Sequence, residues 1–167
     1  EYFSHVVSGR LFPLVLKSVK EIPHLKDGSI YLAVKMQNSQ TSAIQFALVG
    51  IPDKVINRFY ILPKFRDKTR IILLDDIIRL GLDLLFSSLD YDTFTAHTVK
   101  LTRDAELDMD SEIALPILEK VEKSLKQRKT GVPTRFIYDE DIPQDLLRFL
   151  LRKLAIDKDG AIPGGRY

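Results

Sequence analysis

Short apolar runs separated by polar segments begin near residue 29 and predict β-strands. Residues 29–36 are rich in β-branched and aromatic side chains, and residues 44–49 repeat that character after a polar loop at residues 37–42. Two extended apolar runs joined by a short polar loop are typical of a β-hairpin. We therefore expect the two runs to form antiparallel strands.

Two further apolar runs, residues 58–61 and 70–74, predict short strands of their own. The segment between them, residues 63–68, contains a proline and several charges. Proline cannot donate a hydrogen bond to a neighbouring strand, so this segment is expected to lack regular structure.

The spacing of apolar residues changes after Asp75, where it fits a mostly buried helix better than a strand. Gly81 lies within this helix and is not expected to end it. Residues 94–102 then alternate polar and apolar side chains, as a half-buried strand does. The apolar positions of the predicted helix are Ile77, Ile78, Leu80, Leu82, Leu84 and Leu85.

The last third of the chain predicts a helix, a strand and a second helix. The first helix is expected over residues 110–129, because Asp and Ser at its start are favourable N-cap residues. Pro116 requires either a position in the first turn or a kink. Residues 134–138 predict a strand, and Pro143 opens the second helix. The apolar stripes of the two helices are Ala114, Ile117, Leu118, Val121 and Leu125, and Leu146, Leu147, Leu150, Leu151 and Leu154.

The irregular order of these elements predicts an α+β fold, with a mainly antiparallel sheet covered by two to three amphipathic helices. No repeat, low-complexity tract or linker divides the chain, so we expect a single domain over residues 1–167. Residues 1–29 are a poorly legible first segment, apart from an extended piece at residues 11–16. A glycine pair within residues 160–167 predicts a junction towards further parts of a longer protein.

The composition is typical of a globular protein, with 45% hydrophobic and 29% charged residues. The longest apolar runs are far too short to cross a bilayer. The absence of cysteine excludes disulfides and thiolate metal sites, and it favours a reducing cytoplasm. The formal net charge is only +2, so any site for an anion has to be local.

Motifs for catalysis are missing from the sequence. His5, His24 and His97 are far apart and have no metal-ligand spacing. There is no phosphate-binding GxxxxGK[ST] loop, no GxGxxG and no GxSxG. We therefore assign no catalytic, cofactor-binding or metal-binding residue.

Carboxylates at alternate positions of residues 104–110 come nearest to a cation site, because oxygen ligands suit divalent cations. The central glycine of a calcium-binding loop is missing, and a predicted helix N-terminus follows directly. Carboxylates stabilise such an N-terminus, so helix initiation explains them better than metal binding. Arg103, at the preceding strand end, is expected to pair with a carboxylate. The four carboxylates are Asp104, Glu106, Asp108 and Asp110.

Basic residues at helical spacing are candidates for contact with a polyanion, because Lys and Arg donate charge-assisted hydrogen bonds to phosphate oxygens. Glu119 and Glu122 interrupt the first group, which also fits a solvated helix face with intrahelical ion pairs. Both interpretations stay open. The candidate polyanion contacts are Lys120, Lys123, Arg128, Arg148 and Arg152.

Residues 99–110, with the sequence VKLTRDAELDMD, resemble the strand-turn-helix signature of the middle domain of polyphosphate kinases. Further blocks follow in the family's order over residues 30–167, while Ser87-Ser88 and Pro116 depart from the family pattern. These blocks are RFYILP at 58–63, LDDII at 74–78, LF at 85–86, RKTG at 128–131, IPQDLL at 142–147 and PGGRY at 163–167.

The resemblance implies a middle, or head, domain within a larger enzyme. In this family the full chain reversibly transfers the terminal phosphate of ATP to long-chain inorganic polyphosphate through a phosphorylated histidine, with Mg²⁺. The catalytic histidines and phosphate-binding arginines belong to two later domains. The middle domain is associated with dimerisation and with shaping the channel around the active site. This chain alone is therefore expected to be inactive and to hold no cofactor.

The resemblance also implies the partners. They are the other domains of the same chain, a second copy in a homo-oligomer, and polyphosphate as a candidate ligand. The expected location is the cytoplasm, with membrane association only through the parent enzyme. The alternative is an α+β module that binds polyphosphate or nucleic acid without catalysis; an RNA-binding module would stack bases on strand aromatics, but such residues usually belong to the core.

Overall fold

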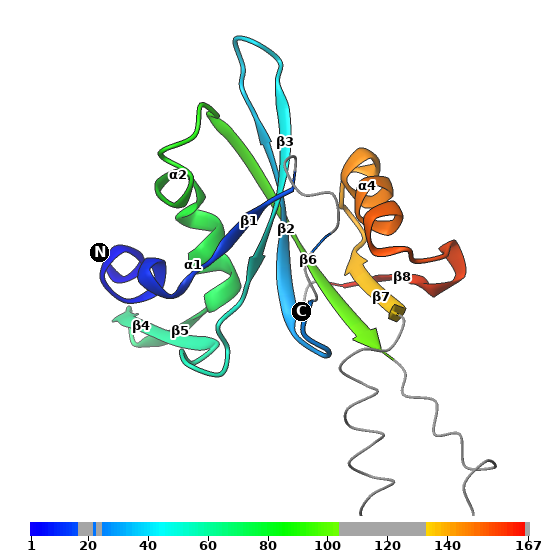
Figure 1. The fold of residues 1–167 in the computed structure, drawn as a ribbon. Coiled ribbons are helices and arrows are strands. Elements are labelled where there is room, and N and C mark those ends of the chain that lie inside the picture. Colours follow the sequence, from blue (N-terminus) through cyan, green and yellow to red (C-terminus); the bar gives the residue numbers. More distant parts are fainter. Residues whose placement is uncertain (17–21, 23–24, 104–132, 166–167) are drawn as a thin grey trace, which may run out of the picture. The chain divides into compact units, whose positions relative to one another are not determined.

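The computed structural model describes residues 1–16, 22, 25–103 and 133–165 (Figure 1). The chain divides into two compact units, and each is described by itself. Antiparallel strand pairs predominate and the helices are few, so the predicted α+β class with a mainly antiparallel sheet is confirmed. Unit 1 comprises Glu1–Lys20 and Ile30–Thr98, and unit 2 comprises Glu21–Ser29 and Val99–Tyr167.

The sheet of unit 1 is built on the first predicted hairpin. Strand β2 (Ile30–Gln37) pairs antiparallel with β3 (Ile44–Gly50), as the sequence indicates. Strand β1 (Pro13–Val15) pairs antiparallel with the other edge of β3. Strand β6 (Thr93–Arg103) begins in unit 1, next to β2, and its last residues belong to unit 2.

The β2–β3 hairpin is buried on both faces. Leu32, Ala33 and Val34 are consecutive residues of β2 and none of them is exposed, which requires cover on both sides of the sheet. The single-turn helices η1 (Phe3–Val7) and η2 (Ser8–Arg10) precede β1. The core of unit 1 consists of Phe3, Val7, Leu11, Leu32, Val34, Met36, Ala47, Val49, Ile51, Ile56, Leu74, Ile77, Ile78, Leu82 and Phe86.

The prediction of one continuous helix after Asp75 is wrong, because two helices meet at Gly81. Helix α1 (Leu74–Leu80) ends there and α2 (Leu82–Leu85) begins directly after it. A Cβ atom at residue 81 would lie 2.5 Å from the ring of Phe3. Only glycine leaves room for this ring to pack against the backbone.

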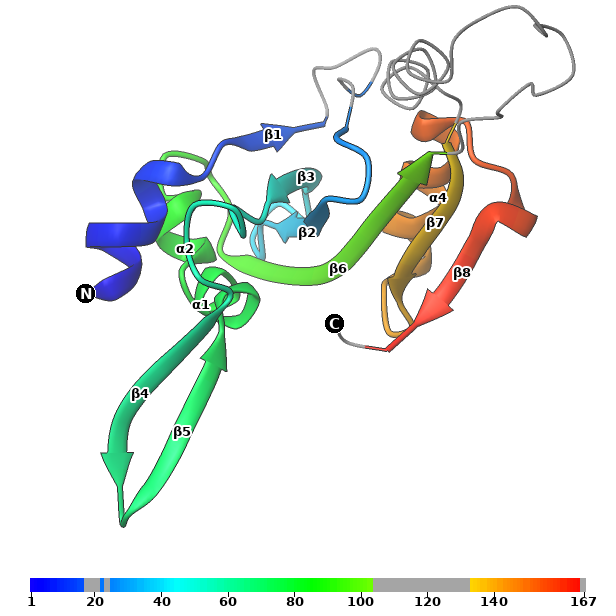
Figure 2. The same cartoon turned by 90° about the horizontal axis from the view of Figure 1, so that it is seen from below.

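A second hairpin in unit 1 forms a separate two-stranded sheet of β4 (Phe59–Phe65) and β5 (Lys68–Leu73). The prediction that residues 63–68 lack regular structure is therefore wrong. The register shifts between Leu62 and Phe65, and this irregularity accommodates the proline, which a two-stranded ribbon tolerates at its edge. Figure 2 shows β4 and β5 projecting away from α1.

The described residues of unit 2 form a short mixed sheet and the helix α4 (Gln144–Leu154). Strand β7 (Pro133–Asp139) pairs antiparallel with the last residues of β6 and parallel with β8 (Ala161–Gly164). Helix α4 follows Pro143, as predicted, and the turn η3 (Lys158–Gly160) leads into β8. The buried face of α4 consists of Leu146, Leu147, Leu150 and Leu154.

Several predictions concern residues or side chains that the structure does not describe, and these stay predictions. They are the helix over residues 110–129 with its Pro116, the carboxylates of residues 104–110, and the pairing of the Arg103 side chain. Within the described ranges, no helix combines the length and the apolar character that a bilayer crossing requires.

Candidate functional site

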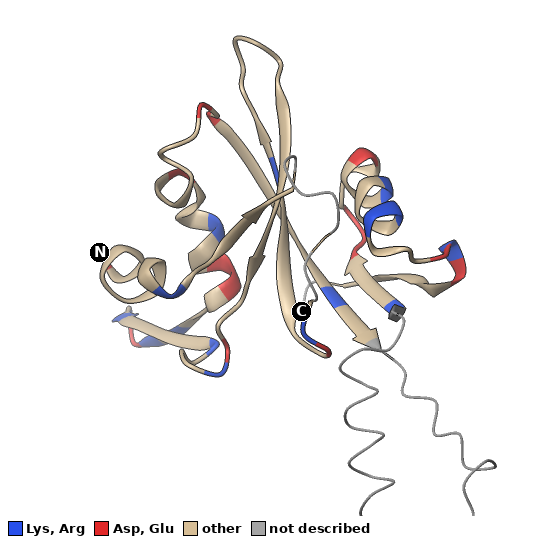
Figure 3. Ribbon diagram, in the orientation of Figure 1, with Lys and Arg blue, Asp and Glu red and all other residues tan. Residues whose placement is uncertain are grey.

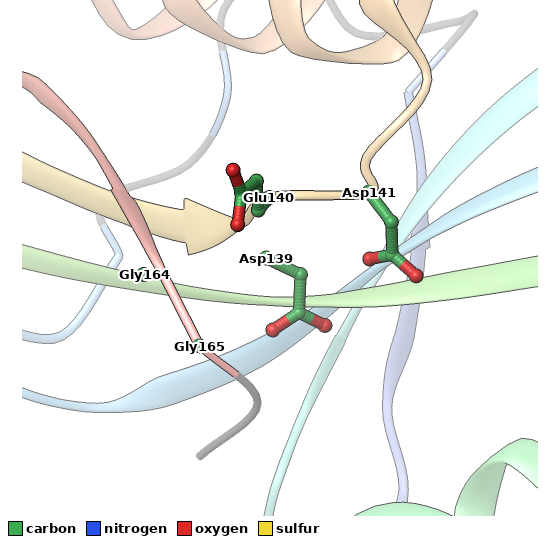
Figure 4. A pocket seen from close by; sticks show the side chains of 5 residues that line it. All are labelled: Asp139, Glu140, Asp141, Gly164 and Gly165. Carbon is green, nitrogen blue, oxygen red and sulfur yellow. The ribbon is translucent and has the colours of Figure 1, made fainter.

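Three adjacent carboxylates line a pocket of about 490 Å³ in unit 2, where the parallel strands β7 and β8 end (Figure 4). Asp139 is the last residue of β7, and Glu140 and Asp141 follow it. Gly164 and Gly165 contribute the other wall. In Figure 4 the side chains of Asp139 and Asp141 point the same way, whereas that of Glu140 points elsewhere.

Two backbone hydrogen bonds place these carboxylates. The amide of Glu140 donates to the carbonyl of Gly164 over 3.2 Å, which continues the parallel pairing of Asp139 with Gly164. The amide of Ile142 donates to the carbonyl of Asp139 over 3.0 Å and closes a turn. The strand end and the turn together bring the three consecutive carboxylates to the end of β8.

The chemistry of this pocket suits a cation better than a bare phosphate chain. Asp139 is only 2% exposed, whereas Glu140 and Asp141 are exposed. Carboxylate oxygens are the ligands that Mg²⁺ and Ca²⁺ prefer, and their negative charge repels phosphate groups. Sequence reasoning missed these residues, although three successive carboxylates after a predicted strand were a visible signal. The contribution of the glycines depends on the pairing of β7 with β8, which no local pattern indicates.

Two of the five candidate polyanion contacts lie among the described residues. Arg148 and Arg152 are exposed and one helical turn apart on α4. The Nε atom of Arg148 donates to the carbonyl of Gln144 over 3.1 Å, and the Cζ atom of Arg152 lies 5.9 Å from the ring centroid of Phe149. The structure therefore brings these two cations to one side of α4. The other three candidates, Lys120, Lys123 and Arg128, lie outside the described residues.

A second pocket, of about 340 Å³, lies within unit 1 and is mainly apolar. Residues of η1, α1, α2, β4 and β5 line it. Leu80 and Leu84 contribute to its lining and are 77% and 57% exposed. The lining is mainly apolar, with Glu1, Tyr2 and Tyr60 as its titratable residues, and it suits the packing of an apolar group better than a reaction.

A buried ion pair joins the base of the β4–β5 hairpin to α1. Arg58 donates through Nε to Oδ1 of Asp75 over 3.2 Å and through Nη2 to Oδ2 over 2.7 Å. Asp75 is fully buried and the side chain of Arg58 is 24% exposed. The hydrogen bond that Arg58 donates to Asp75 raises the pKa of Arg58, and burial opposes this shift. The amide of Leu74 also donates to the carbonyl of Arg58, over 2.7 Å. These contacts fix structure and hold no group for chemistry.

Comparison with known proteins extends over the whole chain. A family model described as the polyphosphate kinase middle domain matches residues 1–167. The polyphosphate kinase of Vibrio parahaemolyticus is 41% identical over 172 residues, and that of Escherichia coli K12 is 39% identical over 171 residues. The crystal structure of the polyphosphate kinase from Porphyromonas gingivalis superposes with a TM-score of 0.74 at 27% identity and covers 99% of this chain.

The chain corresponds to only a part of these relatives. It covers 24% of the length of the Vibrio parahaemolyticus protein, 25% of the Escherichia coli protein and 22% of the Porphyromonas gingivalis chain. The similarity therefore concerns one region of a much longer protein.

Proposed function

Because the chain belongs to the polyphosphate kinase family, as its middle domain, we propose that it is the structural and dimerisation domain of a polyphosphate kinase. The observation that carries this proposal is the family match over all of residues 1–167.

Exposed apolar side chains of unit 1 support a contact role. Phe12 is 84% exposed, Leu80 77%, Ile61 66% and Phe59 65%. Large apolar side chains that are exposed to this extent are candidates for contact with another protein surface. In the parent protein these groups contact the other domains or a second copy of the chain.

The parent enzyme reversibly transfers the terminal phosphate of ATP to long-chain inorganic polyphosphate. In this proposal, ATP, Mg²⁺ and the phosphorylated histidine belong to parts of the protein outside this chain. The names of the relatives support the substrate class. The parent works in the cytoplasm, and any association with a membrane belongs to the parent and not to this domain.

An experiment with labelled ATP tests whether catalysis belongs to domains outside this chain. The purified chain is incubated with Mg²⁺ and ATP labelled at the terminal phosphate, and both the protein and the product are analysed. We expect neither acid-labile phosphorylation of a histidine nor polyphosphate. Sedimentation velocity over a concentration series checks dimerisation. Polyphosphate synthesis by the chain would overturn the assignment of catalysis to other domains, and a monomer at all concentrations would remove dimerisation by this domain alone.

A second candidate function is the binding of polyphosphate or nucleic acid without catalysis. The neighbouring exposed cations Arg148 and Arg152 favour it, and Lys120, Lys123 and Arg128 are further candidate contacts. Contacts with several phosphates weaken steeply as salt rises, because binding releases counterions. A titration with polyphosphate at several salt concentrations therefore tests this function, and affinity that does not change with salt would contradict it.

A further inference from the structure

The turn between β4 and β5 and the strand ends beside it carry four cations within seven residues, and we call this part of the hairpin the cationic tip. All four side chains are exposed, and Asp67 is the one carboxylate among them. Figure 3 shows the colour of Lys and Arg where the two strands meet. The cationic tip consists of Lys64, Arg66, Lys68 and Arg70.

An aromatic ring holds two of these cations close together. The Cζ atoms of Arg66 and Arg70 each lie 5.2 Å from the ring centroid of Phe65. Nη2 of Arg70 also donates to the carbonyl of Pro63 over 3.0 Å. Cation–π contacts of this kind restrain guanidinium groups that would otherwise separate through mutual repulsion.

The backbone of the hairpin explains this arrangement. Without the register shift between Leu62 and Phe65, Phe65 would share a face with Ile61, away from Arg70. The shift places it opposite Lys68 and turns its ring towards Arg70. Arg66 and Asp67 both have a positive φ, 48° and 58°, which is the geometry of a tight hairpin turn.

The charges of the cationic tip are not neutralised within the described part of the chain. Arg58 pairs with Asp75 and Arg79 pairs with Asp76 in unit 1, and neither of these ion pairs involves the tip. A planar guanidinium matches phosphate oxygens through two parallel donors. Two guanidinium groups and two ammonium groups at one turn therefore suit a ligand that presents several phosphates at once.

We propose that the cationic tip binds inorganic polyphosphate. The inference rests on the proposed function, which supplies the ligand class. The tip favours a bare phosphate chain over nucleic acid, because the ring of Phe65 is already engaged by two cations. Proteins that bind single-stranded nucleic acid use such rings to stack bases. Arg148 and Arg152 belong to another element, helix α4 of unit 2.

Binding of end-labelled inorganic polyphosphate to the chain, followed by fluorescence anisotropy over a salt series, tests this site. We expect Arg66→Gln/Arg70→Gln to weaken binding at low salt by about tenfold and to make its dependence on salt shallower by about one unit of slope or more. The matched control is Lys54→Gln/Lys158→Gln, which removes two positive charges at exposed positions outside the tip and outside the candidate contacts of α4. It should change the affinity by less than about threefold. A third variant, Arg148→Gln/Arg152→Gln, compares the tip with the candidate contacts on α4.

Circular dichroism and the thermal midpoint check that each variant folds. If Arg66→Gln/Arg70→Gln does not fold, Lys64→Gln/Lys68→Gln tests the same tip without removing the hydrogen bond of Arg70. Unchanged affinity in a folded tip variant overturns the inference. Loss of affinity only in the α4 variant also overturns it but keeps the binding function proposed above. If the chain does not bind polyphosphate at all, both the tip site and the second candidate function are overturned, and only the structural role remains.

Two further measurements test the identity of the partner. A single-stranded oligothymidylate of similar charge should bind more weakly than polyphosphate, and equal or tighter binding overturns the choice of ligand. Sedimentation velocity is run on the same variants. A dimer that the tip substitutions abolish, with unchanged polyphosphate affinity, would make the tip a protein contact and overturn the inference.

Discussion

The two hairpins of unit 1 are built from similar residues and have opposite environments. In β2–β3, Leu32, Val34 and Ala47 are fully buried. In β4–β5, Ile61 is 66% exposed and Ile71 is 60% exposed, although they are direct cross-strand partners. Both strand pairs contain the β-branched and aromatic residues that favour strands. Composition therefore predicts that a hairpin forms, but not whether anything covers it.

The difference follows from what packs on each hairpin. Helices η1, α1 and α2 contribute residues to the same core as β2 and β3. The β4–β5 hairpin is a two-stranded sheet of its own. An isolated two-stranded hairpin is only marginally stable in water, so its contacts at the base matter most. The exposed face is then available for a partner.

The largest expected effect compares one apolar position in each hairpin. Leu32→Ala in β2 should lower the free energy of unfolding by about 3 kcal/mol, because it removes buried methyl groups and leaves a cavity. Ile61→Ala in β4 should cost less than about 1 kcal/mol, because this side chain is mostly in water already. Urea denaturation measures both. Equal costs would mean that the exposed face of β4–β5 is covered in solution.

An intermediate effect is expected at the base of the exposed hairpin. Asp75→Asn leaves the guanidinium of Arg58 without its charged partner, and breaking a buried pair costs about 3–5 kcal/mol. Since the side chain of Arg58 is 24% exposed, water reduces this cost to about 2 kcal/mol.

The control for Asp75→Asn is Asp76→Asn, one residue further along α1. It breaks the more exposed ion pair with Arg79, which should cost less than about 1 kcal/mol. Thermal and urea unfolding compare the two variants. Similar small losses in both would show that the Arg58–Asp75 pair does not hold the β4–β5 hairpin in place.

The smallest effect concerns the loop of the buried hairpin. The amide of Ser39 donates to Oδ1 of Asp92 over 3.0 Å, and its hydroxyl also donates to this carboxylate. These hydrogen bonds lower the pKa of Asp92 below its ordinary value. The charged form is therefore favoured in the folded state. Its contribution is fully present above the unfolded pKa and is lost as the pH falls through the lower, folded pKa.

Urea midpoints of the wild type and Asp92→Asn test this loop. The wild type should be slightly more stable near pH 7, and the difference should shrink as the pH falls below about 4. Asp90→Asn is the control, because the backbone carbonyl of Asp90, not its side chain, accepts from Asn38. A difference that persists at low pH would contradict the role of the Asp92 charge.

The local sequence pattern was sufficient to predict the elements that show a regular alternation or helical spacing of apolar residues. The β2–β3 hairpin, β6, β7 and α4 were predicted because alternation or helical spacing is visible within each segment. The break at Gly81 was not predicted, and neither was the packing of the Phe3 ring against this glycine, because Phe3 lies almost eighty residues earlier in the chain. Strand β8 was missed for a similar reason, since its proline and glycine do not favour strands and only pairing with β7 defines it.

The candidate sites show the same limit. The carboxylates Asp139 and Asp141 and the basic residues near Phe65 were visible in the sequence, yet neither group follows a motif. Their convergence comes from tertiary features: the meeting of β7 with β8 in one case and a register shift in the other. Sequence reasoning finds charged residues readily, but a distant strand or a bulge decides which of them meet.

The Arg58–Asp75 pair holds the base of the β4–β5 hairpin, so a small rotation at this pair moves the far end of the hairpin by a larger distance. Strand β4 has 7 residues, and at about 3.3 Å per residue the arm is about 23 Å long. A rotation of about 10° at the base then moves the far end by about 4 Å, which is more than the length of a hydrogen bond. The two hydrogen bonds from Arg58 to Asp75 therefore restrict the movement of Arg66 and Arg70 at the far end of the hairpin.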